Sequence, residues 1–194
     1  LAAGLVCALA SYASIDLYAR ALNAFGRNRL RWLAYGALAS GCGVWSTHFL
    51  AMLAYEHRFE QGLDIALTVG SAVIAVALTG AAFAYAVLVR RRETAIVAGA
   101  LLGMAVAAMH YTGMTAYRDG ALLIWDWRYI VASVAVGALL SMLMFRIFLT
   151  PTARARKLAA AGVMTLAICS LHFTGMTALT LVPLAGDGAA GGLS

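Results

Sequence analysis

The sequence predicts an all-α integral membrane protein with six transmembrane helices, and three observations lead to that fold class. Hydrophobic residues make up 63% of the 194 residues and charged residues only 11%, whereas a soluble domain carries roughly a quarter charged residues. The apolar residues fall into runs of the length that crosses a bilayer, about 20 residues. Short polar breaks separate these runs, so neighbouring helices are expected to form antiparallel hairpins.

The six helices are expected near residues 1–22, 30–55, 64–90, 93–117, 126–149 and 155–182. The polar breaks between them are residues 27–29, 56–60, 90–93, 117–127 and 150–157. Pro151 supports the last break, because a proline inside a helix removes a backbone hydrogen bond. Residues 1–182 are therefore interpreted as one membrane domain, followed by a flexible Gly-rich tail at 183–194.

The polar breaks alternate between many and few Lys and Arg residues. Eleven of the fourteen Lys and Arg residues lie in or beside the first, third and fifth breaks. Because cytoplasmic loops of membrane proteins carry an excess of Lys and Arg, both termini are expected outside the cytoplasm of a bacterial inner membrane. The arginines do not form one basic face, so nucleic acid is not expected as a partner. Four aromatic residues are expected at the outer interface: Tyr55, Tyr117, Trp125 and Trp127.

An internal repeat carries the candidate chemistry. His48, His110 and His172 are spaced by 62 and 62 residues. Each is followed by an aromatic residue, by a small residue at the third position and by Met at the fourth. One period corresponds to one hairpin, so the sequence predicts three parallel repeats, about 1–55, 64–117 and 126–182. We expect a pseudo-threefold bundle with the second, fourth and sixth helices nearest its centre.

Small residues favour close helix packing at that centre. Gly36 and Ser40 are four residues apart on the second helix, and Gly99 and Gly103 on the fourth. Such pairs let helix backbones approach one another in a membrane. They are expected to serve the contacts among the inner helices.

Residues four apart share one face of a helix, so each histidine and its methionine point the same way. If the three faces converge near the outer surface, they form one metal site. The candidate ligands are His48, Met52, His110, Met114, His172 and Met176. Imidazole with thioether favours copper, particularly Cu(I), whereas zinc has little use for methionine. The following rings, Phe49, Tyr111 and Phe173, are expected to pack between helices or form a lid, and Gly113 and Gly175 to leave room beside the ligands.

The residues Met109-His110-Tyr111-Thr112, with related motifs at 45–49 and 170–176, resemble the MHYT domain of bacterial membrane sensors. Ser11-Tyr12-Ala13 is similar to the first helix of that family, and the resemblance covers essentially the whole chain. It implies a sensory input domain without enzymatic activity of its own. Copper, a diatomic gas such as O₂, CO or NO, and a cyclic-di-GMP enzyme or kinase as output are implied with it. A chain that ends outside would need a seventh helix to reach a cytoplasmic output domain.

The sequence also allows other interpretations of the three histidines and of the function. The three histidines could form a hydrogen-bonded ring that only sets helix register. A haem protein with His and Met axial ligands, or a copper permease, is the alternative function. Asp16 and Arg20 are expected to pair at one helical turn, and Cys169 to be a buried thiol in preference to a fourth ligand. Paired carboxylates in a span, a phosphate loop and a Ser-His-Asp constellation are not found in the sequence.

Overall fold

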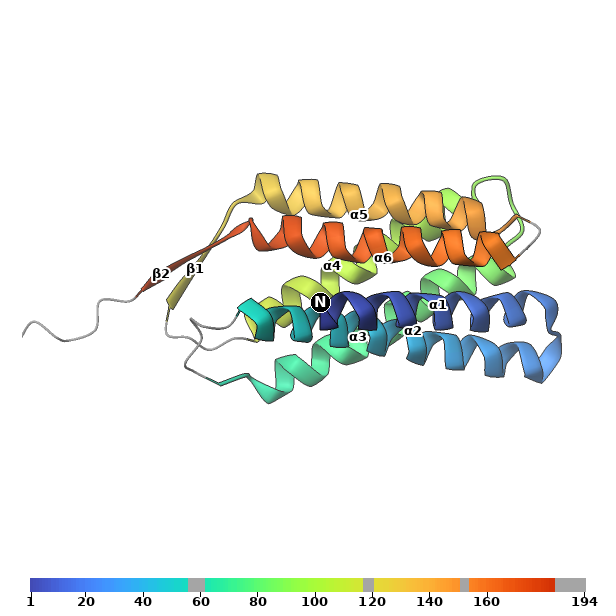
Figure 1. Ribbon diagram of the computed structural model, residues 1–194, viewed down its shortest axis with the longest axis horizontal. Helices are drawn as coiled ribbons and strands as arrows, with labels where there is room; N and C mark the ends of the chain where they lie inside the picture. Colours follow the sequence, from blue (N-terminus) through green and yellow to red (C-terminus); the bar gives the residue numbers. More distant parts are fainter. Residues whose placement is uncertain (56–61, 117–120, 151–153, 184–194) are drawn as a thin grey trace, which may run out of the picture.

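The computed structural model describes residues 1–55, 62–116, 121–150 and 154–183. Within these ranges the chain forms six helices and one two-stranded sheet (Figure 1). The helices are α1 (Ala2–Asn23), α2 (Gly26–Tyr55), α3 (Ile65–Leu88), α4 (Thr94–Thr115), α5 (Trp127–Phe148) and α6 (Arg154–Met176). The strands are β1 (Ala121–Trp125) and β2 (Leu179–Pro183).

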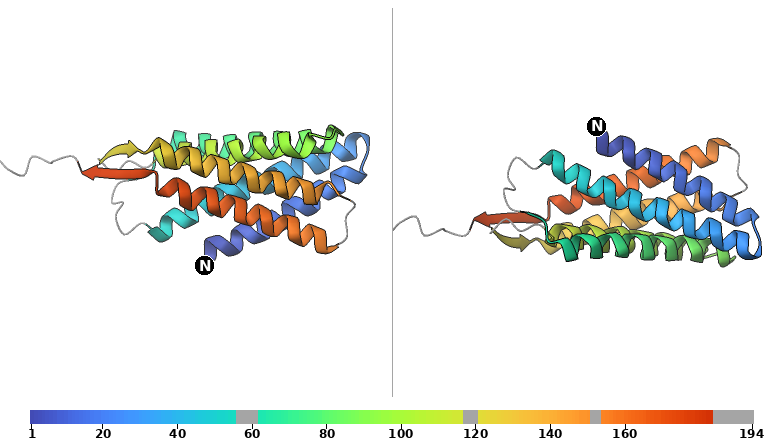
Figure 2. Two further views of the ribbon diagram at one scale, coloured as in Figure 1. Left: turned by 90° about the horizontal axis from the view of Figure 1, so that it is seen from above. Right: turned by 90° about the horizontal axis from the view of Figure 1, so that it is seen from below.

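The helices form one elongated bundle in which each helix packs against the next along the chain (Figures 1 and 2). The last helix, α6, returns to pack against α1 and so closes the bundle. Contacts also join α2 to α4 and α4 to α6 across the interior. The sheet of β1 and β2 projects from one end, and the turn between α1 and α2 lies at the other (Figure 1).

Five helices of the described chain, α1 and α3 to α6, are long and apolar enough to cross a membrane. The remaining helix, α2, has 30 residues but is less apolar on average. Large apolar side chains cover the outer surface of the bundle; Leu9, for example, is 70% exposed and Leu139 is 64% exposed. Such a surface is suited to lipid and not to water. The fold is that of a multi-pass membrane protein.

The interior of the bundle near the α1–α2 turn is aromatic and partly polar. The rings of Tyr18 and Phe83 stack with centroids 3.9 Å apart. The Tyr18 hydroxyl is hydrogen-bonded to Ser40 Oγ at 3.2 Å, and Ser40 Oγ to Thr79 Oγ1 at 2.8 Å. These bonds join α1, α2 and α3 and satisfy polar groups that lipid could not hydrogen-bond.

Two short turns connect helices at this end. The α1–α2 turn is short enough that Gly26, at the start of α2, adopts a left-handed backbone with φ of 54°, which costs glycine little. At the α3–α4 turn, Thr94 Oγ1 accepts a hydrogen bond from the Arg91 amide and donates one to the Val89 carbonyl. The short connection expected around residues 90–93 is therefore confirmed.

An ion-pair cluster at the same end links the first and last helices. Asp16 accepts a hydrogen bond from Arg20 Nε at 2.9 Å, as the sequence predicts, and another from Lys157 Nζ of α6 at 2.7 Å. Arg20 also lies over the Trp32 ring of α2, at 5.1 Å from its centroid. One carboxylate thus holds α1 to α6, in addition to the predicted pair within α1.

Two of the expected helix boundaries are wrong. The last helix ends at Met176 and not near 182, because Leu179–Pro183 forms β2 and pairs antiparallel with β1. The two segments leave the bundle at the same end, and each supplies the other's backbone with hydrogen-bond partners. The break expected at residues 27–29 lies inside α2, which begins at Gly26. Tyr117, Pro151 and most of the 183–194 tail lie outside the described residues.

The small-residue pairs pack differently from the expectation. A Cβ on Gly103 would lie 2.6 Å from Ala138 Cα of α5, and one on Gly99 would meet the Met142 backbone of the same helix. A Cβ on Gly36 would meet the Tyr18 ring of α1. These glycines therefore serve contacts between an inner and an outer helix, and not the contacts among α2, α4 and α6.

Replacing Gly103 with alanine is expected to destabilise the fold. The added methyl group meets backbone atoms of α5, so the two helices must separate, at a cost of about 1–3 kcal/mol. The measurement is the thermal unfolding midpoint of the purified protein in detergent. Gly162→Ala in α6 is the matched control, because nothing lies within 4 Å of its added Cβ and alanine favours a helix. Equal midpoints for the two variants would contradict the close contact.

Candidate metal centre

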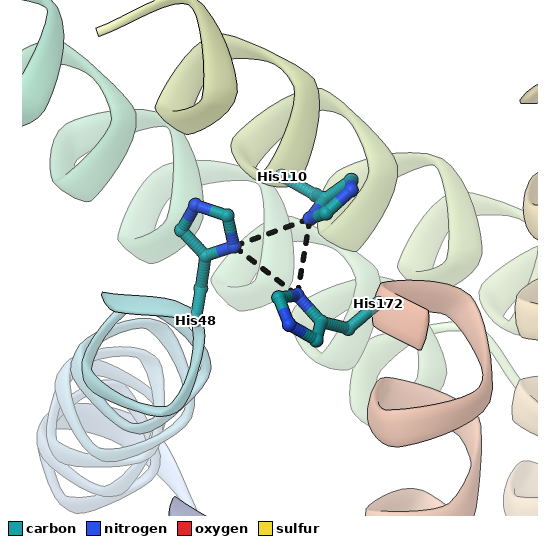
Figure 3. Close-up of side chains that lie close together, drawn as sticks. All are labelled: His48, His110 and His172. Atoms are coloured by element: carbon teal, nitrogen blue, oxygen red, sulfur yellow. Dashed lines mark hydrogen bonds between the residues drawn. The ribbon is translucent and has the colours of Figure 1, made fainter. Parts of the chain in front are cut away.

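Three histidines meet in the interior of the bundle, one each from α2, α4 and α6 (Figure 3). The Nδ1 atoms of His48 and His110 are 3.1 Å apart. The Nδ1 atom of His172 lies 3.3 Å from each of the other two. The three residues are 2%, 1% and 7% exposed. Residues that are 62 and 124 positions apart in the chain thus place three nitrogen atoms in one small triangle.

Hydrogen bonding alone does not account for this triangle. A neutral imidazole has one N–H donor and one acceptor nitrogen, so each Nδ1 either donates or accepts. Among three Nδ1 atoms that all face one another, at least one pair must consist of two donors or two acceptors. Such a pair is repulsive, and it is buried where water does not screen it. A ring that serves only to fix helix register would therefore contain an unfavourable contact.

A cation among the three nitrogens removes that conflict. With bonds of about 2.0 Å, three donors on one face of a tetrahedral ion lie about 3.3 Å apart. The observed separations of 3.1, 3.3 and 3.3 Å match this spacing. No other group of three His, Cys, Asp or Glu residues in the described part of the chain brings its ligand atoms together in this way. The three histidines could hold a metal ion.

Glycines of the neighbouring helices set the orientation of two of the rings. A Cβ on Gly113 would lie 2.7 Å from His48 Nε2, and one on Gly175 would lie 2.5 Å from His110 Nε2. These two Nε2 atoms make no hydrogen bond to the described residues. Packing against a helix backbone, and not a hydrogen bond, therefore directs the Nδ1 atoms of His48 and His110 toward the centre. The expectation that both glycines leave room beside the histidines is confirmed.

The methionines lie one turn closer to the sheet than the histidines. Met52 and Met114 are 0% and 1% exposed and belong to one buried cluster with Phe49. Met176 packs against this cluster and is less buried. The other partly buried residues that pack against the cluster are Trp45 of α2, Trp125 of β1 and Leu179 of β2. The structure thus collects the three methionines over one side of the histidine triangle.

The aromatic residues that follow the histidines have different surroundings. Phe49 is 8% exposed and packs against Trp45, and Tyr111 contacts Trp125 edge to face. The Tyr111 hydroxyl is hydrogen-bonded to Ser133 Oγ of α5 at 2.6 Å. Phe173, by contrast, is 64% exposed. These rings were expected to pack between helices or to form a lid. Packing between helices is confirmed for Phe49 and Tyr111, whereas the exposed side chain of Phe173 does not pack in this way.

The sequence did not single out Leu179 and Ser133, which lie near this centre, and it placed Trp125 only at the outer interface. Leu179 belongs to a strand that helical periodicity could not reveal, and Ser133 is one of several serines in apolar runs. Cys169 is not part of the group of ligand atoms; its thiol interacts with that of Cys7 in α1. Cys169 is partly buried, so the expectation of a buried thiol is met only in part.

Comparison with protein families gives two matches to one family model, described as a bacterial signalling protein N-terminal repeat. The matched segments are residues 41–99 and 103–161, and they begin 62 positions apart, which is the spacing of His48 and His110. The chain belongs to the MHYT family. His172 lies beyond the second MHYT segment, so the third copy of the motif is seen only from the sequence pattern.

Curated relatives of this MHYT chain are bacterial signalling proteins. It is 36% identical over 187 residues to an uncharacterized signaling protein of Caulobacter vibrioides. It is 38% identical over 183 residues to MucR, a bifunctional diguanylate cyclase/cyclic di-GMP phosphodiesterase of Pseudomonas aeruginosa. It is 36% identical over 192 residues to the cyclic di-GMP phosphodiesterase NbdA of the same organism.

These alignments cover 90–94% of the chain but only 23–26% of the relatives. The chain therefore corresponds to about a quarter of each relative, namely the MHYT region. No solved structure matches it.

The hydrogen bond between Tyr111 and Ser133 is expected to stabilise the contact between α4 and α5. Tyr111→Phe and Ser133→Ala should each lower the free energy of unfolding by about 0.5–2 kcal/mol. The double variant should be less destabilised than the sum of the two single variants, because both remove the same bond. The free energy of unfolding of the wild type, the two single variants and the double variant is measured by equilibrium unfolding in detergent. Additive effects within error would show that the two hydroxyls are not coupled.

Proposed function

We propose that this chain is a membrane sensory input domain that binds one metal ion through His48, His110 and His172. The observation that carries the proposal is the triangle of Nδ1 atoms at 3.1–3.3 Å. Membership of the MHYT family and similarity to bacterial signalling proteins support a sensory role. The chain itself holds no enzymatic site in this proposal.

Copper is the proposed metal, with Met52, Met114 and Met176 as the accompanying ligands. Imidazole and thioether together select copper, and thioether particularly selects Cu(I). The cluster of methionines beside the triangle supports this assignment, since carboxylates are not part of the centre. Zinc would accept the histidines but would not use the thioethers.

The sensing step is proposed to be a shift between two arrangements of α2, α4 and α6. One ligand comes from each of these helices, so a change at the metal acts on three helices at once. The stimulus is a diatomic gas (O₂, CO or NO) or a change in the metal or its redox state. Such a stimulus shifts the bundle only if its affinity differs between the two arrangements.

The signal is proposed to reach an output domain that is not part of this chain. The relatives named above are two cyclic-di-GMP enzymes and one signalling protein, and each is about four times as long as the matched region. A cyclic-di-GMP enzyme or a kinase, joined in cis or acting in trans, is therefore the proposed partner.

We further propose that residues 1–182 form a single domain of three repeated hairpins, at about 1–55, 64–117 and 126–182, followed by the 183–194 tail. Equivalent tethers support the repeat. The Asp64 amide donates a hydrogen bond to the Ala116 carbonyl, and the Asp126 amide donates one to the Ala178 carbonyl. Donors and acceptors in the second tether are 62 residues beyond those in the first.

A haem protein and a copper permease are less well supported. Axial haem ligands lie on opposite faces of a porphyrin, whereas these three Nδ1 atoms lie within 3.3 Å of one another. A permease needs polar groups along its path, but Val44, Val106 and Ile168 stand one turn below the histidines. The metal-binding sensor is therefore preferred.

The proposed location is the bacterial inner membrane, with the His-Met centre near the periplasmic side. This orientation is tested with single cysteines placed in a variant that lacks the three native cysteines. A cysteine at Arg128 should react with a membrane-impermeant maleimide added outside intact spheroplasts, and one at Arg91 only after lysis. The reverse labelling would overturn the orientation.

Metal analysis tests the proposed centre. The purified protein is expected to bind one copper ion per chain, and each of His48→Ala, His110→Ala and His172→Ala should lower copper affinity at least tenfold. His57→Ala, the fourth histidine of the sequence, is the control and should retain copper. Met114→Leu should weaken Cu(I) more than Zn²⁺, because only the thioether preference is lost.

Copper content that is unchanged in the triple histidine variant would rule out the shared site. Copper that is lost from all variants including His57→Ala would indicate unfolding, which a thermal melt of each variant detects.

A further inference from the structure

A cavity of about 10 Å³ lies directly against the histidine triangle. It is lined by His48, His110 and His172, by the residues one position earlier, Thr47, Met109 and Leu171, and by those four positions earlier, Val44, Val106 and Ile168. Each of α2, α4 and α6 therefore contributes the same three sequence positions. The cavity lies one turn deeper in the bundle than the histidines, on the side opposite the methionines.

The size of the cavity restricts what it can hold. A cavity needs roughly 10–15 Å³ to accept one water-sized molecule, so this one has room for about one heavy atom, such as the far atom of a small molecule bound at the triangle. Val44, Val106 and Ile168 form its floor, and Leu171 and Met109 form part of its wall. An apolar wall disfavours ions and water, which would lose hydrogen bonds there. A small uncharged molecule is the ligand that the lining favours.

The lining contains one hydroxyl group, that of Thr47. Thr47 is 5% exposed, and its Oγ1 makes no conventional hydrogen bond to the described residues; its neighbour is the Cys7 thiol. The equivalent positions on α4 and α6 are Met109 and Leu171, which offer no hydroxyl. The three helices therefore contribute unequally to the lining, and its one hydroxyl group belongs to Thr47 of α2.

The other side of the triangle is filled by side chains. Met52 and Met114 are 0% and 1% exposed, and they pack with Phe49. A ligand arriving from that side would have to displace these residues. On the cavity side, by contrast, a small space is already present against the histidines.

We propose that the cavity beneath the histidine triangle is the binding site of the exchangeable diatomic ligand, and that Thr47 donates a hydrogen bond to the ligand's far atom. This inference rests on the proposed function, since it needs a metal ion at the triangle. Val44, Val106 and Ile168 then set the size limit of the ligand, and Thr47 favours a ligand whose far atom accepts a hydrogen bond. The methionines lie on the opposite side of the triangle from this ligand.

Carbon monoxide bound to the Cu(I)-loaded full chain in lipid nanodiscs is the probe. Val106→Phe fills the cavity and is expected to keep its copper while its affinity for carbon monoxide falls at least tenfold. Met104→Phe is the matched control on the same helix, because Met104 is 59% exposed and its replacement should leave both values unchanged. Copper content is measured by mass spectrometry and carbon monoxide by its infrared band.

Thr47→Val is nearly isosteric and keeps the proposal testable if Val106→Phe does not fold. It is expected to retain copper and to shift the carbon monoxide band to higher wavenumber, since a hydrogen bond to the oxygen weakens the C–O bond. Thr47→Ser should keep the wild-type band. A wild-type band in Thr47→Val, or wild-type affinity in a folded Val106→Phe, would overturn the cavity assignment.

Met114→Leu distinguishes the two sides of the triangle. A change of affinity in Met114→Leu with none in Val106→Phe or Thr47→Val would place the ligand on the methionine side and overturn the proposal. Wild-type protein that binds no copper would instead refute the proposed function, and this outcome is read from metal content before carbon monoxide is added.

Discussion

The convergence of three imidazoles in an apolar interior is the constraint on which the rest of this structure depends. His48, His110 and His172 come from three different helices, and their Nδ1 atoms approach within 3.1–3.3 Å. This arrangement requires a fixed rotation of α2, α4 and α6 about their own axes and a fixed position of each helix along the bundle axis. A one-residue change of register would turn a histidine by about 100° around its helix and remove it from the triangle. The bundle must therefore be held firmly at its contacts.

Hydroxyl groups on the outer helices supply part of that restraint. Ser71 of α3 accepts a hydrogen bond from Trp45 Nε1 of α2 at 3.2 Å, and Ser133 of α5 is bonded to Tyr111 of α4 at 2.6 Å. Each bond joins an inner helix to the next outer helix within one or three residues of a histidine. Both serines are 0% exposed, so these bonds form where water cannot compete with them.

The far end of the bundle is held by different means. Asp16 joins Arg20 and Lys157 and so ties α1 to α6, and Tyr18 stacks on Phe83 while its hydroxyl reaches Ser40. The ionic and aromatic contacts therefore join the helices at the end of the bundle that contains the α1–α2 turn. The candidate metal centre lies nearer the other end. In the proposed sensor, a change at the metal would move the inner helices against the end with the α1–α2 turn.

Much of this architecture could be predicted from the sequence. Apolar runs of membrane-spanning length predict the helices, because lipid favours a chain whose backbone groups are satisfied within each helix. The spacing of 62 residues singles out three histidines, and the helical period places each methionine on the face of its histidine. The pairing of Asp16 with Arg20 follows from the same period. These are properties of one helix at a time, and local geometry decides them.

Contacts between helices were decided only by the tertiary structure. The helical period cannot tell which imidazole nitrogen faces the centre, and it is the backbone near Gly113 and Gly175 that turns two of the rings. The strand pairing of Ala121–Trp125 with Leu179–Pro183 joins segments far apart in the chain, so no local sequence pattern predicts it. The cavity beneath the histidines depends on the sizes of side chains from three helices together. The sequence by itself determined which residues share a helix face, whereas the packing of whole helices determined which atoms of those residues meet.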